Sequence, residues 1–111
     1  MTDPFPATTP DPPYVAVIFT TEQSDDIDGY AAMAERMLEL ARTQPGFLGV
    51  ESVREGAQGV TVSYWRDMGC VRAWGAHPEH REAQRLGRER WYKTWRLRIV
   101  EVGVERRSGS D

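Results

Sequence analysis

The pattern of apolar and polar residues predicts one α+β domain with the element order β-α-β-β-α-β. A continuous apolar run at residues 14–20 has the length and the β-branched content of a strand buried on both faces. Apolar residues then recur at helical spacing between residues 27 and 41. Two strand-like runs follow, joined by a glycine-bearing turn of hairpin length. A chain of 111 residues is long enough for one core and too short for two.

The domain is expected to cover residues 14–106, between two tails. Residues 1–13 hold five of the seven prolines, which remove backbone donors and favour extended, solvated conformations. This segment therefore predicts a flexible tail, and residues 107–111 predict a short disordered one.

The first strand, Tyr14–Thr20, leads into the best-defined helix. Ser24 and Asp25 are expected to cap it, because their side chains can accept hydrogen bonds from the first backbone N–H groups of a helix. The helix has apolar residues on one side and charged residues on the other. It ends before the Pro-Gly pair at residues 45–46.

Two strands and two shorter helices follow. The strands are Phe47–Arg54 and Val60–Trp65. Asp67 is expected to cap a short helix. Pro78 disfavours helical backbone at the residue before it, so a second helix is expected to start at Pro78. Gly87 is expected to break or bend that helix.

The last strand, Arg96–Arg106, changes phase along its length. Leu97 and Ile99 share one face, and the valines that follow take the other. This switch predicts a β-bulge near Ile99.

The element order is that of the ferredoxin-like split βαβ unit, a four-stranded antiparallel sheet with its helices on one face. The opposite face would meet water in a monomer. Yet the first strand is apolar on both faces, and the last strand turns valines to each side of its expected bulge. We therefore expect a homodimer in which two sheets pack together.

The composition argues against several classes of partner. A net charge of −3 does not suit a nucleic-acid binder, and the arginines of the C-terminal third alternate with glutamates, as on an ion-paired surface. Cys70 is the only cysteine, so the chain has no CxxC motif. No apolar run approaches the ~20 residues of a membrane span. With no export signal at the N-terminus, a cytoplasmic location is expected.

Trp74, His77 and His80 are the residues with the clearest chemical potential. An imidazole with an ordinary pKa of ~6.5 can take a phenolic proton, and aromatic faces bind planar ligands. His80 and Trp91 lie eleven residues apart, so one uninterrupted helix would place both on the wall of one cavity. His77 has a second interpretation, as the cap of the helix that starts at Pro78.

A metal site is the alternative for His77 and His80 together with Glu79. Zinc needs three or four convergent ligands, and the chain has no third histidine and no second cysteine. We therefore expect no bound metal. Tyr64 and Trp65 occupy opposite faces of their strand, so only one of them can face a given cavity.

Three segments resemble the antibiotic biosynthesis monooxygenase family. They are QPGFLGVES (Gln44–Ser52), TVSYW (Thr61–Trp65) and RAWGAHPEHREAQRLGRERWY (Arg72–Tyr92). The resemblance implies a dimeric α+β barrel. It also implies oxidation of a planar aromatic or quinone-like compound without metal or flavin, because the substrate's own phenolate or enolate gives an electron to dioxygen.

The resemblance also suggests roles for single residues. His80 would be the catalytic base, and His77 would be a second catalytic residue. The expected substrate-binding residues are Trp74, Gln84, Trp91, Tyr92 and Tyr64.

Two other functions remain open. One branch of the family degrades haem and carries a histidine ten residues after a tryptophan, with an asparagine on the first strand. Here Gln84 follows Trp74 at that spacing and Tyr14–Thr20 contains no asparagine, which argues against haem degradation. The rival function is a non-catalytic ligand-binding or stress-related homodimer that uses the same cavity.

Overall fold

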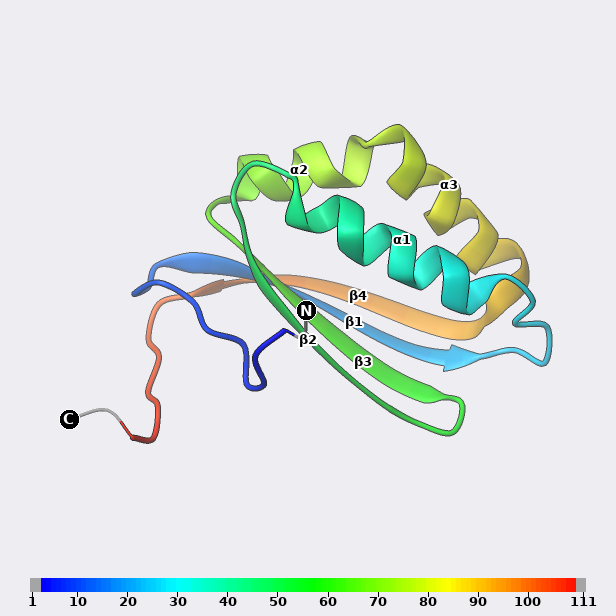
Figure 1. Cartoon of the computed structure of the whole chain (residues 1–111), viewed down its shortest axis with the longest axis horizontal. Helices are drawn as coiled ribbons and strands as arrows, with labels where there is room; N and C mark the ends of the chain where they lie inside the picture. The colour runs from blue at the N-terminus through cyan, green and yellow to red at the C-terminus, as the bar shows by residue number, and fades with distance from the viewer. Residues whose placement is uncertain (1–2, 110–111) are drawn as a thin grey trace.

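The computed structural model describes residues 3–109 and shows a four-stranded antiparallel sheet with all helices on one face (Figure 1). The elements in chain order are β1 (Tyr14–Gln23), α1 (Tyr30–Arg42), β2 (Phe47–Glu55), β3 (Gln58–Trp65), α2 (Met68–Ala76), α3 (Pro78–Leu86), the π-helical turn η1 (Gly87–Trp91) and β4 (Tyr92–Val102). The strand order is β2-β3-β1-β4. The predicted ferredoxin-like α+β fold is confirmed.

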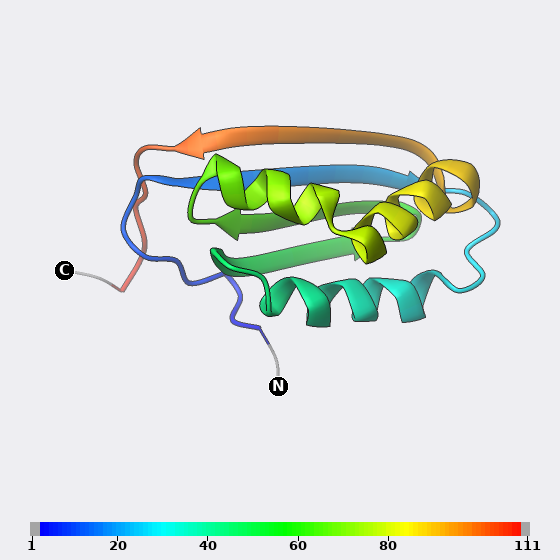
Figure 2. The ribbon, with the colours of Figure 1, turned by 90° about the horizontal axis from the view of Figure 1, so that it is seen from above.

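The helices do not cover the sheet evenly. Seen from above, α1 lies along the β2 edge, and α2 runs over the middle strands (Figure 2). Strand β4 is left uncovered at the opposite edge (Figure 2). Three of its apolar side chains on the helix side are consequently exposed, namely Trp95, Leu97 and Ile99.

The core lies between the helices and the middle of the sheet. Val15 of β1, Trp65 of β3, Ala41 of α1 and Val71 of α2 are buried in one cluster, in which Trp65 has no exposed surface. Val15 pairs directly with Trp65, so both point to the same face. The Trp65 indole N–H donates to the Ser63 hydroxyl at 2.9 Å, which satisfies its one polar atom.

Helix α1 begins later than the sequence predicts. The residue at its N-cap is Gly29, with a φ of 81°, and neither Ser24 nor Asp25 caps the helix. Ser24 is engaged over a longer range, because its backbone N–H donates to the Trp91 carbonyl at 2.7 Å and its hydroxyl donates to the Arg90 carbonyl. These bonds hold the loop before α1 against η1. They could not be predicted from the local sequence pattern.

The β-bulge expected near Ile99 is wrong. The pairing of β1 with β4 runs without a shift through residues 94–102 of β4, and its irregularity lies at the far end, between Glu22 and Gln23. Ile99 pairs with Val17 on the helix side, whereas Val100 pairs with Ala16 on the open side. The strand is therefore regular and simply apolar on both faces.

The described part of the proline-rich segment, residues 3–13, contacts the domain. Asp3 forms an ion pair with Arg42 at 2.6 Å, and the Thr9 hydroxyl donates to the Glu105 carboxylate at 2.8 Å. Glu105 also accepts from the Tyr14 hydroxyl at 2.6 Å. The ion pair ties residue 3 to α1, and Glu105 ties the segment after β4 both to the segment before β1 and to the start of β1.

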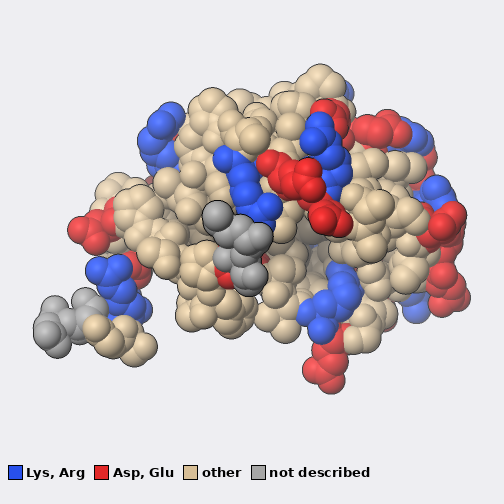
Figure 3. Space-filling model, viewed as in Figure 1, with Lys and Arg blue, Asp and Glu red and all other residues tan. Residues whose placement is uncertain are grey.

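Charged side chains of both signs are interspersed over the helices (Figure 3). Arg36 of α1 pairs with Glu79 of α3 at 3.0 Å, and Arg85 pairs with both Glu82 and Glu89. Of the arginines in the C-terminal third, Arg85 and Arg90 therefore form ion pairs as expected. None of the helices in the described range combines the length and the hydropathy that crossing a bilayer requires.

Candidate functional site

Two helix caps bring the candidate residues together. The Asp67 carboxylate accepts from the Cys70 N–H at 2.9 Å and so caps α2. Nδ1 of His77 accepts from the Glu79 N–H at 3.2 Å and so caps α3, with Pro78 as its first residue. The sequence predicts both helix starts, and the structure confirms them. Of the two interpretations of His77, the observed contact is that of a cap.

His80 lies flat against Trp74. The ring centroids are 4.1 Å apart and the planes differ by 12°. Nδ1 of His80 lies 2.9 Å from the Trp74 backbone carbonyl. A carbonyl oxygen can only accept a hydrogen bond, so Nδ1 must carry a proton. In the neutral ring, the remaining nitrogen, Nε2, then has a free lone pair.

The protonation state of His80 follows from its surroundings. Burial lowers its pKa below the ordinary value, the proximity of His77 lowers it further, and the hydrogen bond to the Trp74 carbonyl opposes both effects. A lowered pKa keeps the imidazole neutral at pH 7. His80 can therefore accept a proton at Nε2, which is what general base catalysis requires.

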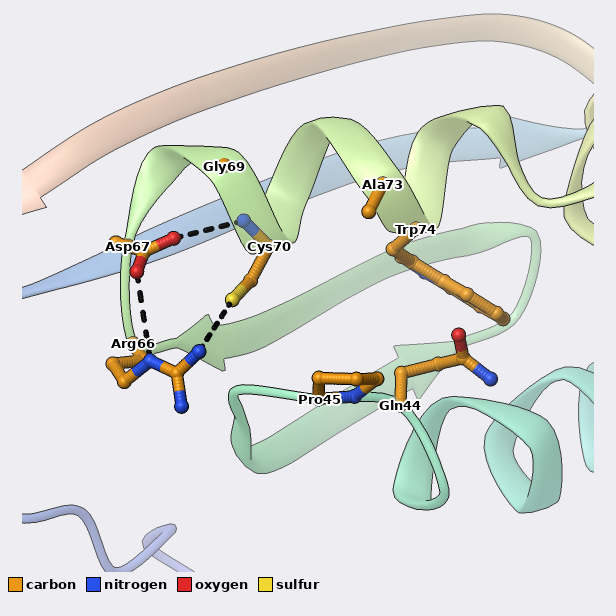
Figure 4. A pocket seen from close by; sticks show the side chains of 8 residues that line it. All are labelled: Gln44, Pro45, Arg66, Asp67, Gly69, Cys70, Ala73 and Trp74. Atoms are coloured by element: carbon orange, nitrogen blue, oxygen red, sulfur yellow. Dashed lines mark hydrogen bonds and ion pairs between the residues drawn. The ribbon is translucent and has the colours of Figure 1, made fainter.

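Trp74 connects His80 to the core and to a cavity. Its indole stacks on Trp65 with centroids 6.0 Å apart and an angle of 25°, and Trp65 contacts Phe47 edge to face at 5.4 Å. Trp74 also bounds a cavity of about 180 Å³ between α2 and the segment after α1 (Figure 4). The cavity is lined by Gln44, Pro45, Arg66, Asp67, Gly69, Cys70, Ala73 and Trp74.

The two ends of this cavity differ in chemistry. At one end the Trp74 indole points towards the Gln44 side chain (Figure 4). At the other end the Cys70 sulfur accepts from the Arg66 guanidinium at 3.4 Å. Sequence reasoning did not select Gln44 or Arg66. The available signal was their position, because Gln44 lies two residues after the end of α1 and Arg66 lies two residues before the start of α2.

Gln84 is a polar residue of α3 on the same side of the helix as His80. It follows His80 by one helical turn, so both lie on the same face of α3, and both are half-buried. Its amide carries both donors and an acceptor.

Trp91 and Tyr92 belong to a second aromatic cluster. Trp91 is buried, and its indole N–H donates to the Asp28 carbonyl at 2.9 Å. Its ring packs edge to face on Tyr30, with the ring centroids 5.6 Å apart. The ring of Tyr92 packs edge to face on Tyr30 and on Phe19, with ring centroids 5.9 Å and 5.3 Å away respectively. Burial, followed by the nearby Tyr30 hydroxyl, raises the pKa of Tyr92.

The expected shared helix face of His80 and Trp91 is not formed. Helix α3 ends at Leu86, and the wider π-helical turn, Gly87–Trp91, rotates Trp91 out of the α-helical register. Trp91 instead packs beside Gly29, at the start of α1.

Tyr64 lies on the opposite face of the sheet from Trp74. Its neighbour Trp65 takes the helix face, so Tyr64 points to the open face, as the alternation of a strand requires. Its hydroxyl donates to Glu51 at 2.8 Å, and its ring meets Tyr14 edge to face at 5.8 Å. Burial and the hydrogen bond to Glu51 raise the pKa of the Tyr64 phenol.

A further polar group, also absent from the sequence interpretation, surrounds Arg54 on the helix face. Its guanidinium donates to the Tyr30 hydroxyl at 3.1 Å and to the Ala57 carbonyl at 3.0 Å, and lies 5.5 Å from the centre of the Tyr30 ring. A Cβ at Gly59 would lie 2.6 Å from this guanidinium. The missing side chain at residue 59 therefore makes room for Arg54. Within residues 3–109, no three His, Cys, Asp or Glu side chains are grouped to hold a metal ion.

Comparisons with known proteins agree with the fold. The structure superposes on SnoaB, a cofactor-independent oxygenase from Streptomyces nogalater, with a TM-score of 0.72 at 16% identity over 90% of this chain and 100% of that chain. It superposes on Rv0793 from Mycobacterium tuberculosis with a TM-score of 0.73 at 15% identity over 86% of this chain and 99% of that chain. At such identities the likeness concerns the fold alone.

Sequence comparison gives a closer relationship. Residues 13–86 match the model of the family described as antibiotic biosynthesis monooxygenase. The chain is also 48% identical over 103 residues to the uncharacterized protein YqjZ of Bacillus subtilis (strain 168), covering 92% of this chain and 90% of that protein. The chain therefore belongs to the antibiotic biosynthesis monooxygenase family.

Proposed function

We propose that this protein is a cofactor-independent monooxygenase that oxidises a planar phenolic or quinone-like compound beside Trp74 and His80. The observation that carries this proposal is the geometry of His80, which stacks on the Trp74 indole and donates its Nδ1–H to the Trp74 carbonyl, so that the lone pair of Nε2 can accept a proton. Burial lowers the pKa of His80, which favours the neutral ring. The description of SnoaB as a cofactor-independent oxygenase supports the same reaction class for this fold.

The proposed reaction begins with a proton transfer. Nε2 of His80 takes a proton from the phenol or enol of the substrate, and the resulting anion passes one electron to dioxygen. The substrate radical and superoxide combine, and the peroxide that forms takes up a proton and loses water. For an anthrone, one dioxygen thus converts the ring CH₂ into a carbonyl and yields one water. The protein supplies the base and an environment with little water.

The substrate is proposed to lie against Trp74 within reach of Gln84. Aromatic faces hold planar rings, and an amide can pair with a carbonyl or hydroxyl of the ligand. The cavity of about 180 Å³ that Trp74 bounds has room for one ring of a fused compound, and the remaining rings would extend beyond it towards His80 and Gln84, which do not line it. In this proposal Trp91 and Tyr64 stabilise the fold and do not bind the substrate, because they form hydrogen bonds to Asp28 and Glu51 respectively.

The test uses 1,8-dihydroxyanthrone as the probe. Oxygen uptake and quinone absorbance should rise with enzyme concentration, with one dioxygen consumed per quinone formed. His80→Gln should lower the rate by about 10²-fold or more, as expected when a general base is lost. Arg81→Gln is the matched control, because Arg81 is exposed on the same helix. An equal rate in wild type and His80→Gln would refute the proposed role of His80.

The rival function predicts a different result with the same probe. A non-catalytic ligand-binding protein would quench its tryptophan fluorescence on binding the anthrone, and would show no oxygen uptake above the spontaneous rate. That combination would replace the monooxygenase proposal by a binding function.

We also propose a homodimer with a cytoplasmic location. Val53 and Val60 on the open face are 59% and 41% exposed, and they border a hollow of about 820 Å³. On the uncovered edge, Leu97 is 47% exposed. A second copy would remove this apolar surface from water, burying at least ~1,000 Å². Sedimentation equilibrium at micromolar concentration should give twice the 12.6 kDa of one chain, and a stable monomer would contradict the dimer. Cell fractionation tests the location.

A further inference from the structure

The junction between α2 and α3 contains an unusual hydrogen-bond acceptor. In a continuous α-helix, the Trp74 carbonyl would accept from the backbone N–H of residue 78. That residue is Pro78, which has no N–H. The backbone at His77 is extended, with ψ at 129°, so α2 stops and α3 starts afresh.

The Trp74 carbonyl is used by two other donors. The His77 N–H lies 3.1 Å from it, and Nδ1 of His80 lies 2.9 Å from it. A carbonyl oxygen has two lone pairs, so these two bonds occupy it fully. A third donor, such as a backbone N–H at residue 78, would compete with His80 for the same oxygen.

We propose that Pro78 is a positioning residue that fixes the tautomer of His80. By withholding a backbone donor, it reserves the Trp74 carbonyl for Nδ1–H and so leaves Nε2 as the nitrogen that meets the ligand. The catalytic meaning of this arrangement rests on the proposed function, but the tautomer itself does not. Pro78 touches no reacting atom in this account and acts only through the Trp74 carbonyl.

The arrangement also selects the chemistry of the ligand group beside His80. A neutral imidazole has one N–H, and here that N–H is donated to a backbone carbonyl. Its other nitrogen can therefore only accept a hydrogen bond. The ligand must therefore offer a donor, such as a phenolic or enolic O–H, and a bare carbonyl oxygen would find no partner there. Reversal of the tautomer would present Nε2–H, which donates to the ligand and cannot take its proton.

The test reads the tautomer directly, without any ligand. Long-range ¹H–¹⁵N spectra of ¹⁵N-histidine-labelled protein distinguish the protonated from the bare ring nitrogen. They are recorded well above the ordinary imidazole pKa, and His80→Gln assigns the signals. The wild-type protein should show His80 protonated at Nδ1. In Pro78→Ala, the ratio of the Nδ1–H to the Nε2–H form should fall about tenfold, the change that follows loss of one hydrogen bond.

Trp74→Phe is the matched control. It changes the stacked ring but keeps the backbone carbonyl, so the chemical shifts of His80 should move while its tautomer stays Nδ1–H. If Pro78→Ala keeps that tautomer as well, Pro78 is not the cause and the proposal is overturned. If Pro78→Ala does not fold, the ratio is read in Pro78→Ser, which also restores a backbone N–H at residue 78 and should show the same fall. An Nε2–H form in the wild type overturns the proposal outright.

An activity measurement separates this inference from the proposed function. With 1,8-dihydroxyanthrone, Pro78→Ala should lower kcat in proportion to the loss of the Nδ1–H population, which is smaller than the tenfold fall of the tautomer ratio, and should change KM little. If no variant, nor the wild type, consumes oxygen, the proposed function fails. The tautomer ratios of the wild type and of Pro78→Ala would still decide the role of Pro78.

Discussion

Gly46 offers the sharpest stability prediction. It joins α1 to β2 with a φ of +82°, a left-handed conformation that costs a residue with a side chain about 1–2 kcal/mol. A Cβ at this position would lie 2.3 Å from the Cys70 sulfur and 2.9 Å from its Cβ. Overlap of this kind in a packed site costs about 1–3 kcal/mol more. Gly46→Ala should therefore destabilise the protein by about 2–5 kcal/mol in total.

Gly56→Ala is the matched control for this change. Gly56 also has a left-handed backbone, with φ at +58°, but nothing lies within 4 Å of the Cβ position. Gly56→Ala should therefore lower the free energy of unfolding only by the cost of the left-handed backbone, about 1–2 kcal/mol. Urea unfolding followed by circular dichroism, at one fixed protein concentration, should place the midpoint of Gly46→Ala clearly below that of Gly56→Ala.

A double variant tests the cause of the difference. Adding Cys70→Ala to Gly46→Ala removes the sulfur at 2.3 Å and leaves the Cβ at 2.9 Å, so part of the lost stability should return. Equal midpoints for the variants at Gly46 and Gly56, or no recovery in the double variant, would refute the steric argument.

Three further predictions concern Trp65, Gly59 and His80. Trp65→Ala should cost about 3–5 kcal/mol in thermal or urea unfolding, because the indole has no exposed surface. Gly59→Ala should displace the flexible Arg54 guanidinium from Tyr30 and cost ~1 kcal/mol or less, and thermal melts should show no such cost in an Arg54→Ala background. The lowered pKa of His80 means that the unfolded chain binds its proton first, so the unfolding free energy should fall as pH drops below the ordinary value of ~6.5. Urea titrations at several pH values should show a weaker dependence in His80→Gln.

Local signals in the sequence predicted most of the fold. Asp67 and Pro78 each mark a helix start by a mechanism that needs no distant partner, and both starts are confirmed. The start of α1 was missed because Ser24 bonds to the carbonyl of Arg90, far along the chain. The bulge near Ile99 was wrong because an edge strand can be apolar on both faces and still pair regularly.

The candidate site was predictable only in part. Trp74 and His80 stand out by residue type, but their stacking depends on the chain turning between two helices. Trp91 was expected beside His80. The π-helical turn that separates them could not be predicted from the spacing of apolar residues in the sequence. Strand alternation placed Tyr64 and Trp65 on opposite faces, yet only the assembled sheet shows that Trp65 is the one facing the helices.

The position of β1 between β3 and β4 has a consequence for how the chain folds. Strands β2 and β3 can form a hairpin as soon as they are made, whereas Tyr14 finds its partner Val102 only after nearly the whole chain exists. Contacts between such distant residues carry a large loop-closure entropy and form slowly. Until β4 arrives, β1 presents an unpaired edge on which another nascent chain can add a strand. The time at which β4, the last strand of this domain, is synthesised thus decides how long the growing domain is open to aggregation.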